Sequence, residues 1–248
     1  MKIRLFISRG QINVGDICVL DKNQSHYLKN VLRLGLGGEV FVFNNLDGEF
    51  LAKIIVVGKS VEINITEKVA SFYSSPNIGL VFSPVKNVKS EYIVTKATEL
   101  GVRVIQPVRC ERTIVTKVNH NKLQLNAIEA AEQSRRVDLP LIEEIKNLES
   151  FLKGVTENDI IILADESGDG DIPEKLFSKI HINRDSRALV IIGPEGGFSD
   201  KEREMMKSIK NTYSMVMGPR ILRADTAIIA SLMILQNYIG DIENKPSF

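Results

Sequence analysis

Apolar residues occur in short runs through the first 70 residues, and Gly, Asp and Asn separate these runs. Short β-prone segments with frequent turn residues are typical of a small β-barrel. One segment differs, because the residues from Ser25 to Arg33 predict a helix that ends at the glycines from Gly35 to Gly38. We expect strands at residues 3–7, 17–20, 40–44, 50–57 and 61–65.

Strands alternate with helices beyond a short linker, Ser-Ser-Pro-Asn, at residues 74–77. This alternation indicates a mostly parallel sheet with helices on both faces, and so an α/β domain. We therefore expect a barrel domain at residues 1–72 and an α/β domain at residues 73–248. The expected strands are 78–82, 102–107, 160–164, 188–192 and 213–217, the expected helices include 88–100 and 123–136, and a loose loop is expected at 165–171.

A glycine-rich turn, Gly-Pro-Glu-Gly-Gly, follows the apolar run from Ala188 to Ile192 and occupies Gly193 to Gly197. A helix begins directly after it, because Ser199 and Glu202 have the spacing of a capping box. Glycines leave backbone N–H and C=O groups uncovered, so a ligand can lie against the main chain. A turn without any ligand fits this pattern equally well.

A second glycine turn repeats the order of strand, turn and helix near the end of the chain. It reads Gly-Pro-Arg-Ile-Leu-Arg from Gly218 to Arg223, and the helix expected at 227–235 has Ser231 as its only polar residue. A helix that is apolar on every face must be buried on all sides, so it is either threaded into the domain or covered by a partner subunit. Ligands of doubly wound sheets bind at the carboxyl ends of strands, where two such turns would form the walls of one crevice.

The composition is that of an ordinary globular protein, with 44% hydrophobic residues, 25% charged residues and a net charge of +1. This charge is compatible with recognition of one structured RNA through local patches, and equally with no nucleic-acid binding. The 2 cysteines lie far apart without a CxxC spacing and the 3 histidines are scattered, so we expect neither a disulfide framework nor a metal site. The chain shows no signal peptide and no membrane-spanning run, which favours a cytoplasmic location.

The motifs that the two turns lack limit their chemistry. Neither turn is a phosphate-binding P-loop or a dinucleotide-binding fingerprint, and the chain has no GxSxG nucleophile elbow. The polar side chains that remain are Glu195, Arg220 and Arg223, which suit an uncharged aromatic base with polar edges. The polar side of the helix expected at 25–33 either faces water or binds RNA.

Four motifs in order along the chain point to one family. The segments from Ile192 to Ser199 and from Gly218 to Ala227 resemble the ribosomal RNA small subunit methyltransferase E family, a branch of the knotted SPOUT methyltransferases. Residues 96–102 (Lys-Ala-Thr-Glu-Leu-Gly-Val) and 129–136 (Glu-Ala-Ala-Glu-Gln-Ser-Arg-Arg) agree with the same family, and the resemblance covers essentially the whole chain. It implies methylation of N3 of a uridine in 16S rRNA of the small ribosomal subunit, with S-adenosylmethionine as the methyl donor and without a metal.

The resemblance also implies an architecture and partners. A PUA-like, RNA-binding barrel is expected to precede an α/β domain with a deep trefoil knot, which is an exception to the rule that chains do not thread loops. Two copies of the chain are expected to form a homodimer that completes the site. The expected macromolecular partner is 16S rRNA within the small ribosomal subunit, with no role for a membrane.

The matching positions suggest which residues carry the function. Arg223 is the expected catalytic residue, because a guanidinium stays protonated and can stabilise negative charge on the uracil oxygens. No side chain is an obvious general base, and Glu195 either takes this part or fixes the glycine turn by hydrogen bonds. Cofactor contacts are expected at Leu163, Gly193, Glu195, Gly196, Met217, Gly218, Ile221, Leu222, Arg223 and Thr226.

One departure from the family is visible, since Ala224-Asp225-Thr226 stands where the family usually has Thr-Glu-Thr. Asp is the better N-cap, so a capping role would survive, whereas a contact that needs the longer Glu would be weakened. Two other functions stay open: a non-catalytic RNA-binding or ribosome-assembly factor, and a methyltransferase of the same fold that acts on another RNA position. RNA contacts are expected at Arg9, Arg33, Arg135 and Arg136, each of which is equally compatible with a surface salt bridge.

Overall fold

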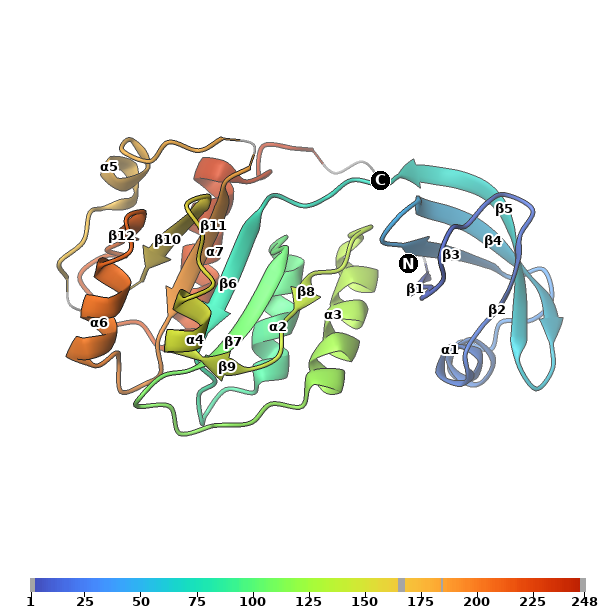
Figure 1. Cartoon of the computed structure of the whole chain (residues 1–248). Helices are drawn as coiled ribbons and strands as arrows, with labels where there is room; N and C mark the ends of the chain where they lie inside the picture. Colours follow the sequence, from blue (N-terminus) through green and yellow to red (C-terminus); the bar gives the residue numbers. More distant parts are fainter. Residues whose placement is uncertain (1–2, 165–167, 184, 246–248) are drawn as a thin grey trace. The chain divides into compact units, whose positions relative to one another are not determined.

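The computed structural model describes residues 3–164, 168–183 and 185–245, and it divides the chain into two compact units. The first unit contains the residues up to 74 together with residues 131–139, and the second contains the rest. No pattern in the sequence indicated that residues 131–139 group with the N-terminal part of the chain. Figure 1 shows the two units and the order of their elements.

A five-stranded sheet with the order β1-β3-β4-β5-β2 forms the first unit. Only the pair of β1 and β3 is parallel, and the other neighbours run antiparallel. Alternate residues of β4 and of the first half of β5 point into a core of mostly aliphatic side chains, as expected for a sheet with one buried face. The strands are β1 (Arg4–Phe6), β2 (Ile17–Val19), β3 (Glu39–Asn44), β4 (Gly48–Val57) and β5 (Val61–Ser71).

The helix of this unit begins earlier than the pattern predicted. It comprises α1 (Lys22–His26) and a π-helical turn, η1 (Tyr27–Val31), instead of residues 25–33. The early start has a clear cause, because Asp21 and Gln24 form a reciprocal capping box. The helix ends before Arg33, whose φ of 55° lies in the left-handed region.

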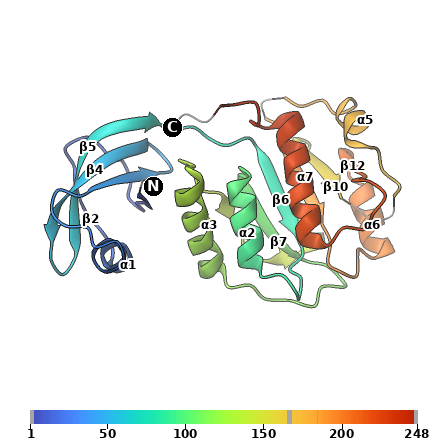
Figure 2. The ribbon, with the colours of Figure 1, turned by 180° about the vertical axis from the view of Figure 1, so that it is seen from behind.

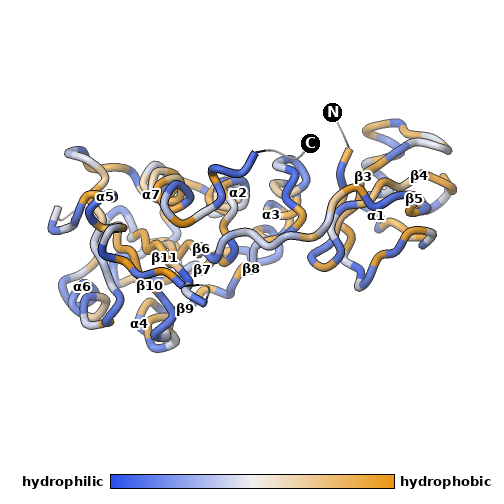
Figure 3. The backbone as a smooth tube through the Cα atoms, turned by 90° about the horizontal axis from the view of Figure 1, so that it is seen from above, coloured by the Kyte–Doolittle hydropathy of each residue, from blue (hydrophilic) through white to orange (hydrophobic). Residues whose placement is uncertain are grey.

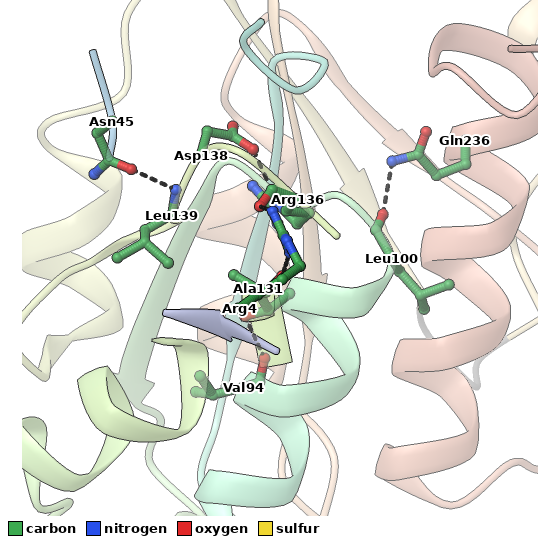
Figure 4. Close-up of polar contacts among 10 residues, drawn as sticks. Arg4, Asn45, Val94, Leu100, Ala131, Arg136, Asp138, Leu139 and Gln236 are labelled. Carbon is green, nitrogen blue, oxygen red and sulfur yellow. Dashed lines mark hydrogen bonds and ion pairs between the residues drawn. The ribbon is translucent and has the colours of Figure 1, made fainter. Parts of the chain in front are cut away.

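Arg4 holds residues 131–139 in the first unit (Figure 4). Its buried guanidinium donates hydrogen bonds to the carbonyl oxygens of Ala131 (2.7 Å) and Arg136 (2.9 Å), and lies 4.5 Å from the ring centre of Phe43. These carbonyls belong to the C-terminal end of α3 (His120–Ser134) and the residues just after it, where acceptors lack helical partners. A cation is therefore favourable at this position.

A seven-stranded sheet forms the centre of the second unit, with the order β12-β10-β11-β6-β7-β8 and with β9 paired to β7. Every pair of neighbours is parallel. All residues of β6 and β10 are buried, as expected for strands covered on both faces. The strands are β6 (Ile78–Phe82), β7 (Val104–Arg109), β8 (Leu141–Ile142), β9 (Lys146–Asn147), β10 (Asp159–Leu163), β11 (Arg187–Ile192) and β12 (Thr212–Ser214).

Helices cover both faces of this sheet (Figures 2 and 3). One face packs against α2 (Ser90–Glu99), α3, α5 (Pro173–Phe177) and α7 (Ala224–Ile239), and the other against α4 (Leu148–Leu152) and α6 (Asp200–Lys207). The expected α/β architecture is thus present. In the part of the chain that the structure describes, no helix is both long and apolar enough to cross a membrane.

Two helix boundaries differ from the sequence expectation for local reasons. Helix α3 starts at His120 because the side chain of Asn119 accepts a hydrogen bond from the backbone N–H of Lys122. It ends at Ser134 because Arg135 has a φ of 64°. Helix α2 ends as expected, with Gly101 just beyond it at a φ of +72°.

The prediction that the last helix is buried on all sides is wrong for a single chain. Helix α7 is longer than expected, and only one of its faces packs on the sheet, through residues such as Ile228, Leu232 and Leu235. On the opposite side Met233 is 39% exposed, whereas the half-exposed ring of Tyr238 stacks on Phe177 of α5 with 4.5 Å between the ring centres. The sheet can cover only one face of a helix that lies on it, so the side of α7 that carries Met233 faces away from the sheet.

Candidate functional site

The carboxyl ends of β6, β10 and β11 lie at one edge of the sheet, because these parallel strands are neighbours in the order β10-β11-β6. A cavity of about 540 Å³ opens at this edge. It lies within the range of about 300–1,000 Å³ that is usual for small-molecule sites. Its walls are Val85, Asn87 and Val88 in the loop after β6, Ala164 after β10, the glycine turn after β11, and residues 221–225 at the start of α7.

A second cavity of about 330 Å³ adjoins the first. It is lined mainly by the segment from Met215 to Leu222, which leads from β12 to α7. Ala164, Ile221 and Leu222 line both cavities, so the two are parts of one crevice. The two glycine turns therefore contribute to the same crevice, as the sequence predicted.

The first glycine turn is held in place from within the protein. The N–H of Gly197 donates to the carbonyl of Pro194 (2.9 Å), and a carboxylate oxygen of Glu195 accepts a hydrogen bond from the N–H of Lys86 (2.9 Å). A Cβ atom at Gly193 would lie 3.1 Å from the buried ring of Phe198. Glycine at this position thus allows the ring to pack under the turn, and Glu195 ties the turn to the loop after β6. This bond supports the structural role considered for Glu195.

The second glycine turn requires a left-handed backbone conformation at Gly218. Gly218 has a φ of +91°, and a Cβ atom there would meet nothing closer than 4.0 Å. Ile221 at the rim is 80% exposed. Among the residues that the structure describes, neither Arg220 nor Arg223 forms a hydrogen bond or an ion pair through its side chain. Both guanidinium groups are exposed and available to a ligand.

The ten expected cofactor contacts do not all line the crevice. Leu163 is buried in the core beside the sheet, next to Ala164. Gly196 is exposed on the outer side of the turn, where its carbonyl accepts a hydrogen bond from Arg112, and Thr226 is exposed in the first turn of α7. The other seven line one cavity or both: Gly193, Glu195, Met217, Gly218, Ile221, Leu222 and Arg223.

The four arginines expected to contact RNA have different surroundings. Arg9 is exposed and donates to the carbonyl of Ile17 and to the sulfur of Cys18, and Arg33 is exposed. Arg135 is half-buried. Arg136 is buried and pairs with Asp138 at 3.0 Å, so its guanidinium lies in the interior of the first unit (Figure 4). This burial corrects the expectation for Arg136, because a side chain that contacts RNA must reach the surface.

Asp225 does not cap the last helix. The N-cap residue is Arg223, and no side chain caps this helix end. Asp225 lies in the first turn, where a carboxylate is favourable near the helix N-terminus, and it lines the larger cavity. Its Oδ1 atom is buried and has no hydrogen-bond partner among the described residues. The capping role expected to survive the change from Glu to Asp is therefore not the role of this residue.

The wall formed by the loop after β6 was not anticipated. Val85, Asn87 and Val88 line the larger cavity. The strand before them was predicted, but only the order of strands in the sheet brings its carboxyl end beside β11. A proline at the strand end, Pro84, is the sole local signal of a special loop.

Two further observations limit the chemistry of the site. Burial, with a smaller effect of Glu202, raises the pKa of the Cys110 thiol to about 12, so this cysteine is no nucleophile near neutral pH. Across residues 3–164, 168–183 and 185–245 no group of His, Cys, Asp and Glu side chains has the arrangement of a metal site. The crevice thus offers backbone groups, apolar side chains, the polar side chains of Asn87, Glu195 and Asp225, and two exposed arginines.

Known proteins share both the sequence and the fold of this chain. A family model described as an RNA methyltransferase domain matches residues 73–236, and one described as an RNA methyltransferase PUA domain matches residues 20–66. The ribosomal RNA small subunit methyltransferase E of Rickettsia conorii is 33% identical over 92% of this chain and 93% of its own. The chain belongs to the ribosomal RNA small subunit methyltransferase E family.

Solved structures of similar proteins agree with this assignment. A methyltransferase of Legionella pneumophila, in complex with S-adenosylmethionine, is 28% identical with a TM-score of 0.86, and the match covers 98% of this chain and 100% of that one. The ribosomal RNA small subunit methyltransferase E of Neisseria gonorrhoeae, bound to S-adenosylmethionine, is 26% identical with a TM-score of 0.85 over the same shares. The expected fold class, a PUA domain followed by a mostly parallel α/β methyltransferase domain, is confirmed. The trefoil knot stays a prediction.

Proposed function

We propose that this chain uses S-adenosylmethionine to methylate N3 of one uridine in 16S rRNA of the small ribosomal subunit. The observation that carries the proposal is the crevice that both glycine turns line, in a chain similar to two proteins solved with S-adenosylmethionine. The residues we propose for cofactor binding are those expected from the sequence. Seven of them line the crevice directly. Leu163, Gly196 and Thr226 are proposed to contribute by positioning neighbouring residues that line it.

The crevice fits this cofactor in its size and in the chemistry of its walls. Glycine turns present bare backbone donors and acceptors, which suit the polar edges of an adenine, and apolar residues such as Met217 and Leu222 suit its faces. When bound, S-adenosylmethionine supplies the methyl group as an electrophile. The protein then has to bring the uracil base close to this methyl group and exclude water, which accounts for much of the rate enhancement of such reactions.

Arg223 is proposed to assist the loss of the N3 proton. Uracil N3 becomes a good nucleophile only when it loses this proton, and the resulting negative charge spreads onto the neighbouring oxygens. Arg223 lines the larger cavity and has no partner among the described residues, so its N–H groups are available to those oxygens. A guanidinium cannot accept the proton, so its contribution is electrostatic.

RNA recognition is proposed to involve the first unit, which spans the match to the PUA domain. Arg33 and Arg9 are exposed there and can contact phosphates. Arg135 is half-buried and stays a proposed RNA contact, whereas Arg136 is proposed to act in the packing of residues 131–139 against Arg4, through its backbone carbonyl and its pair with Asp138. The division into an RNA-binding domain at 1–72 and a methyltransferase domain at 73–248 remains our proposal for the functional parts.

The chain is proposed to act as a homodimer through the outer face of α7. An apolar face of this kind gains stability when a second copy covers it. We expect the protein to sediment as a dimer, and Met233→Glu to shift it to a monomer, because a buried charge without a partner opposes association. Ile55→Glu is the control, since Ile55 is 40% exposed, much as Met233 is, but lies on β4. A wild-type monomer in analytical ultracentrifugation would refute the dimer.

Calorimetry with the purified protein tests the proposed function. We expect S-adenosylmethionine to bind with a stoichiometry of one per chain, and a nucleotide such as ATP not to bind. Absence of any S-adenosylmethionine binding would refute the proposal and favour a non-catalytic RNA-binding factor. Binding without methyl transfer to 16S rRNA in small subunits would instead point to another RNA substrate.

A further inference from the structure

A buried network fixes the loop that follows β7. The N–H of Cys110 donates to the hydroxyl oxygen of Thr113 (2.7 Å), and this hydroxyl lies 2.7 Å from the hydroxyl of Ser83 at the end of β6. The N–H of Thr113 closes the turn on the carbonyl of Cys110 (3.1 Å). These bonds involve main chain and short side chains, so they leave the loop little freedom.

Glu202 joins the same loop to the helix after the first glycine turn. One of its carboxylate oxygens accepts the N–H of Glu111 (2.8 Å), and the other accepts the N–H of Ser199 (2.9 Å) as part of the capping box at the start of α6. Glu202 is buried, at 7% exposure. A buried carboxylate with two backbone donors holds its partners firmly, since separating them would leave a charge unsatisfied.

This scaffold places Arg112 on the outside of the glycine turn. The stem of Arg112 packs over Gly196, where an added Cβ atom would lie 3.3 Å from the Arg112 Cβ atom and 3.4 Å from its Cδ atom. Its Nη1 atom donates to the carbonyl oxygen of Gly196 (2.8 Å). No acidic side chain among the described residues pairs with Arg112, so its positive charge is uncompensated and most of its N–H donors are available.

Other cations surround the same turn. Burial and, to a smaller extent, the nearby positive charge of Arg112 lower the pKa of Arg203 on α6. Lys86 is exposed in the loop after β6, and its backbone N–H donates to Glu195 of the same turn. Like charges that lie close together repel each other, and a bound anion lowers this repulsion. We call Lys86, Arg112 and Arg203 the cationic rim.

None of the three residues of the cationic rim lines either cavity, and Arg112 lies against Gly196, which does not line them either. A ligand inside the crevice lies on the inner side of the turn, whereas the rim is reached from its outer side. On the proposed function, the target base enters the crevice while the RNA backbone stays outside it. We propose that the cationic rim, with Arg112 at its centre, binds a backbone phosphate of the RNA next to the target nucleotide.

Phosphate binding at this position would fix the register of the RNA without reading its sequence. The planar fork of a guanidinium can contact two phosphate oxygens at once, and its stem is already ordered over Gly196. Because the network through Thr113 and Glu202 holds Arg112 in place, little conformational freedom is lost on binding. The turn would thus hold the cofactor on one side and the RNA backbone on the other.

Binding of 16S rRNA fragments to Arg112→Ala, measured at several salt concentrations, tests this inference. We expect affinity to fall about tenfold, which is typical for the loss of one charged hydrogen-bonding group. The slope of log affinity against log salt should become shallower by about 0.7–0.9, which corresponds to one phosphate contact. Binding of S-adenosylmethionine and kcat at saturating RNA should stay within about twofold, and Arg112→Lys should retain part of the affinity.

Arg103→Ala is the matched control. Arg103 is also exposed, but it stands just before β7 while Arg112 stands just after it, at the opposite edge of the sheet. An unchanged salt slope in Arg112→Ala would overturn the inference. Weakened S-adenosylmethionine binding with unchanged RNA binding would also overturn the inference. Arg112 would then bind the carboxylate of S-adenosylmethionine instead of an RNA phosphate. Either of these results leaves the proposed function intact as long as the wild-type protein methylates 16S rRNA. If the wild-type protein does not methylate 16S rRNA, both the proposed function and the inference about Arg112 are overturned.

Discussion

Arg223→Ala is expected to lower kcat for methyl transfer by about 10²–10³-fold, the usual loss when one stabilising donor of an anionic transition state is removed. The reason is that Arg223 supplies the free guanidinium in the larger cavity that can stabilise charge on the uracil oxygens. Binding of S-adenosylmethionine should change much less than kcat. Single-turnover transfer of a labelled methyl group, with calorimetry of the same variant, separates the two effects.

The same variant should not be less stable than wild type. Arg223 is the N-cap residue of α7, and a cation at a helix N-terminus is unfavourable by about 0.3–1 kcal/mol. Arg223→Lys keeps the charge without the planar fork, so it should recover only a small part of kcat. Arg220→Ala removes an exposed arginine from the same segment and is expected to affect kcat far less. Wild-type kcat in Arg223→Ala would contradict the proposed role and favour a non-catalytic RNA-binding factor.

Gly218→Ala is expected to weaken S-adenosylmethionine binding at least about tenfold, because an alanine cannot hold a φ of +91° without strain of about 1–3 kcal/mol. Nothing lies close enough to a new Cβ atom to clash, so the effect comes from the backbone alone. The segment would relax to another conformation, and the smaller cavity that it lines would change shape. Calorimetric titration of the variant measures this loss.

Gly37→Ala provides a matched control for this prediction. Gly37 has a φ of +77°, and nothing lies within 4 Å of an added Cβ atom, but the residue belongs to the first unit. Both variants should lower the free energy of unfolding by about 1–2 kcal/mol, as expected for an L-residue in the left-handed region. Only Gly218→Ala should lose cofactor affinity. Equal affinities in the two variants would show that the second turn does not shape the site.

Local patterns were sufficient to predict the buried strands and the two turns, but not the two-residue strands β8 and β9. Strand β6 occupies the predicted residues, and Ser199 and Glu202 form the predicted capping box. Buried parallel strands are uninterrupted apolar runs, so their signal is strong. Helices α4 and α5 were missed because five residues contain little more than one turn and show no periodicity.

Features that depend on distant contacts could not be predicted. The second half of β5 is only partly buried, so its residues do not alternate clearly and the strand was ended at residue 65 instead of Ser71. Apolar residues all around α7 indicated burial, but they cannot say whether the chain or a partner provides it. The strand order brings the loop after β6 to the crevice, and a network of buried bonds places Arg112 against the outer side of the first glycine turn. Residues 165–167 of the expected loop lie outside the described residues.

The central claim is methylation of N3 of one uridine in small-subunit rRNA, and reconstitution tests it most directly. Small ribosomal subunits from a strain that lacks this gene would be incubated with the purified protein and S-adenosylmethionine, and the 16S rRNA digested and analysed by mass spectrometry. We predict one N3-methyluridine that requires both the protein and the cofactor, and that Arg223→Ala fails to produce in the same time. Unmodified rRNA, or a methyl group on another base, would contradict the account.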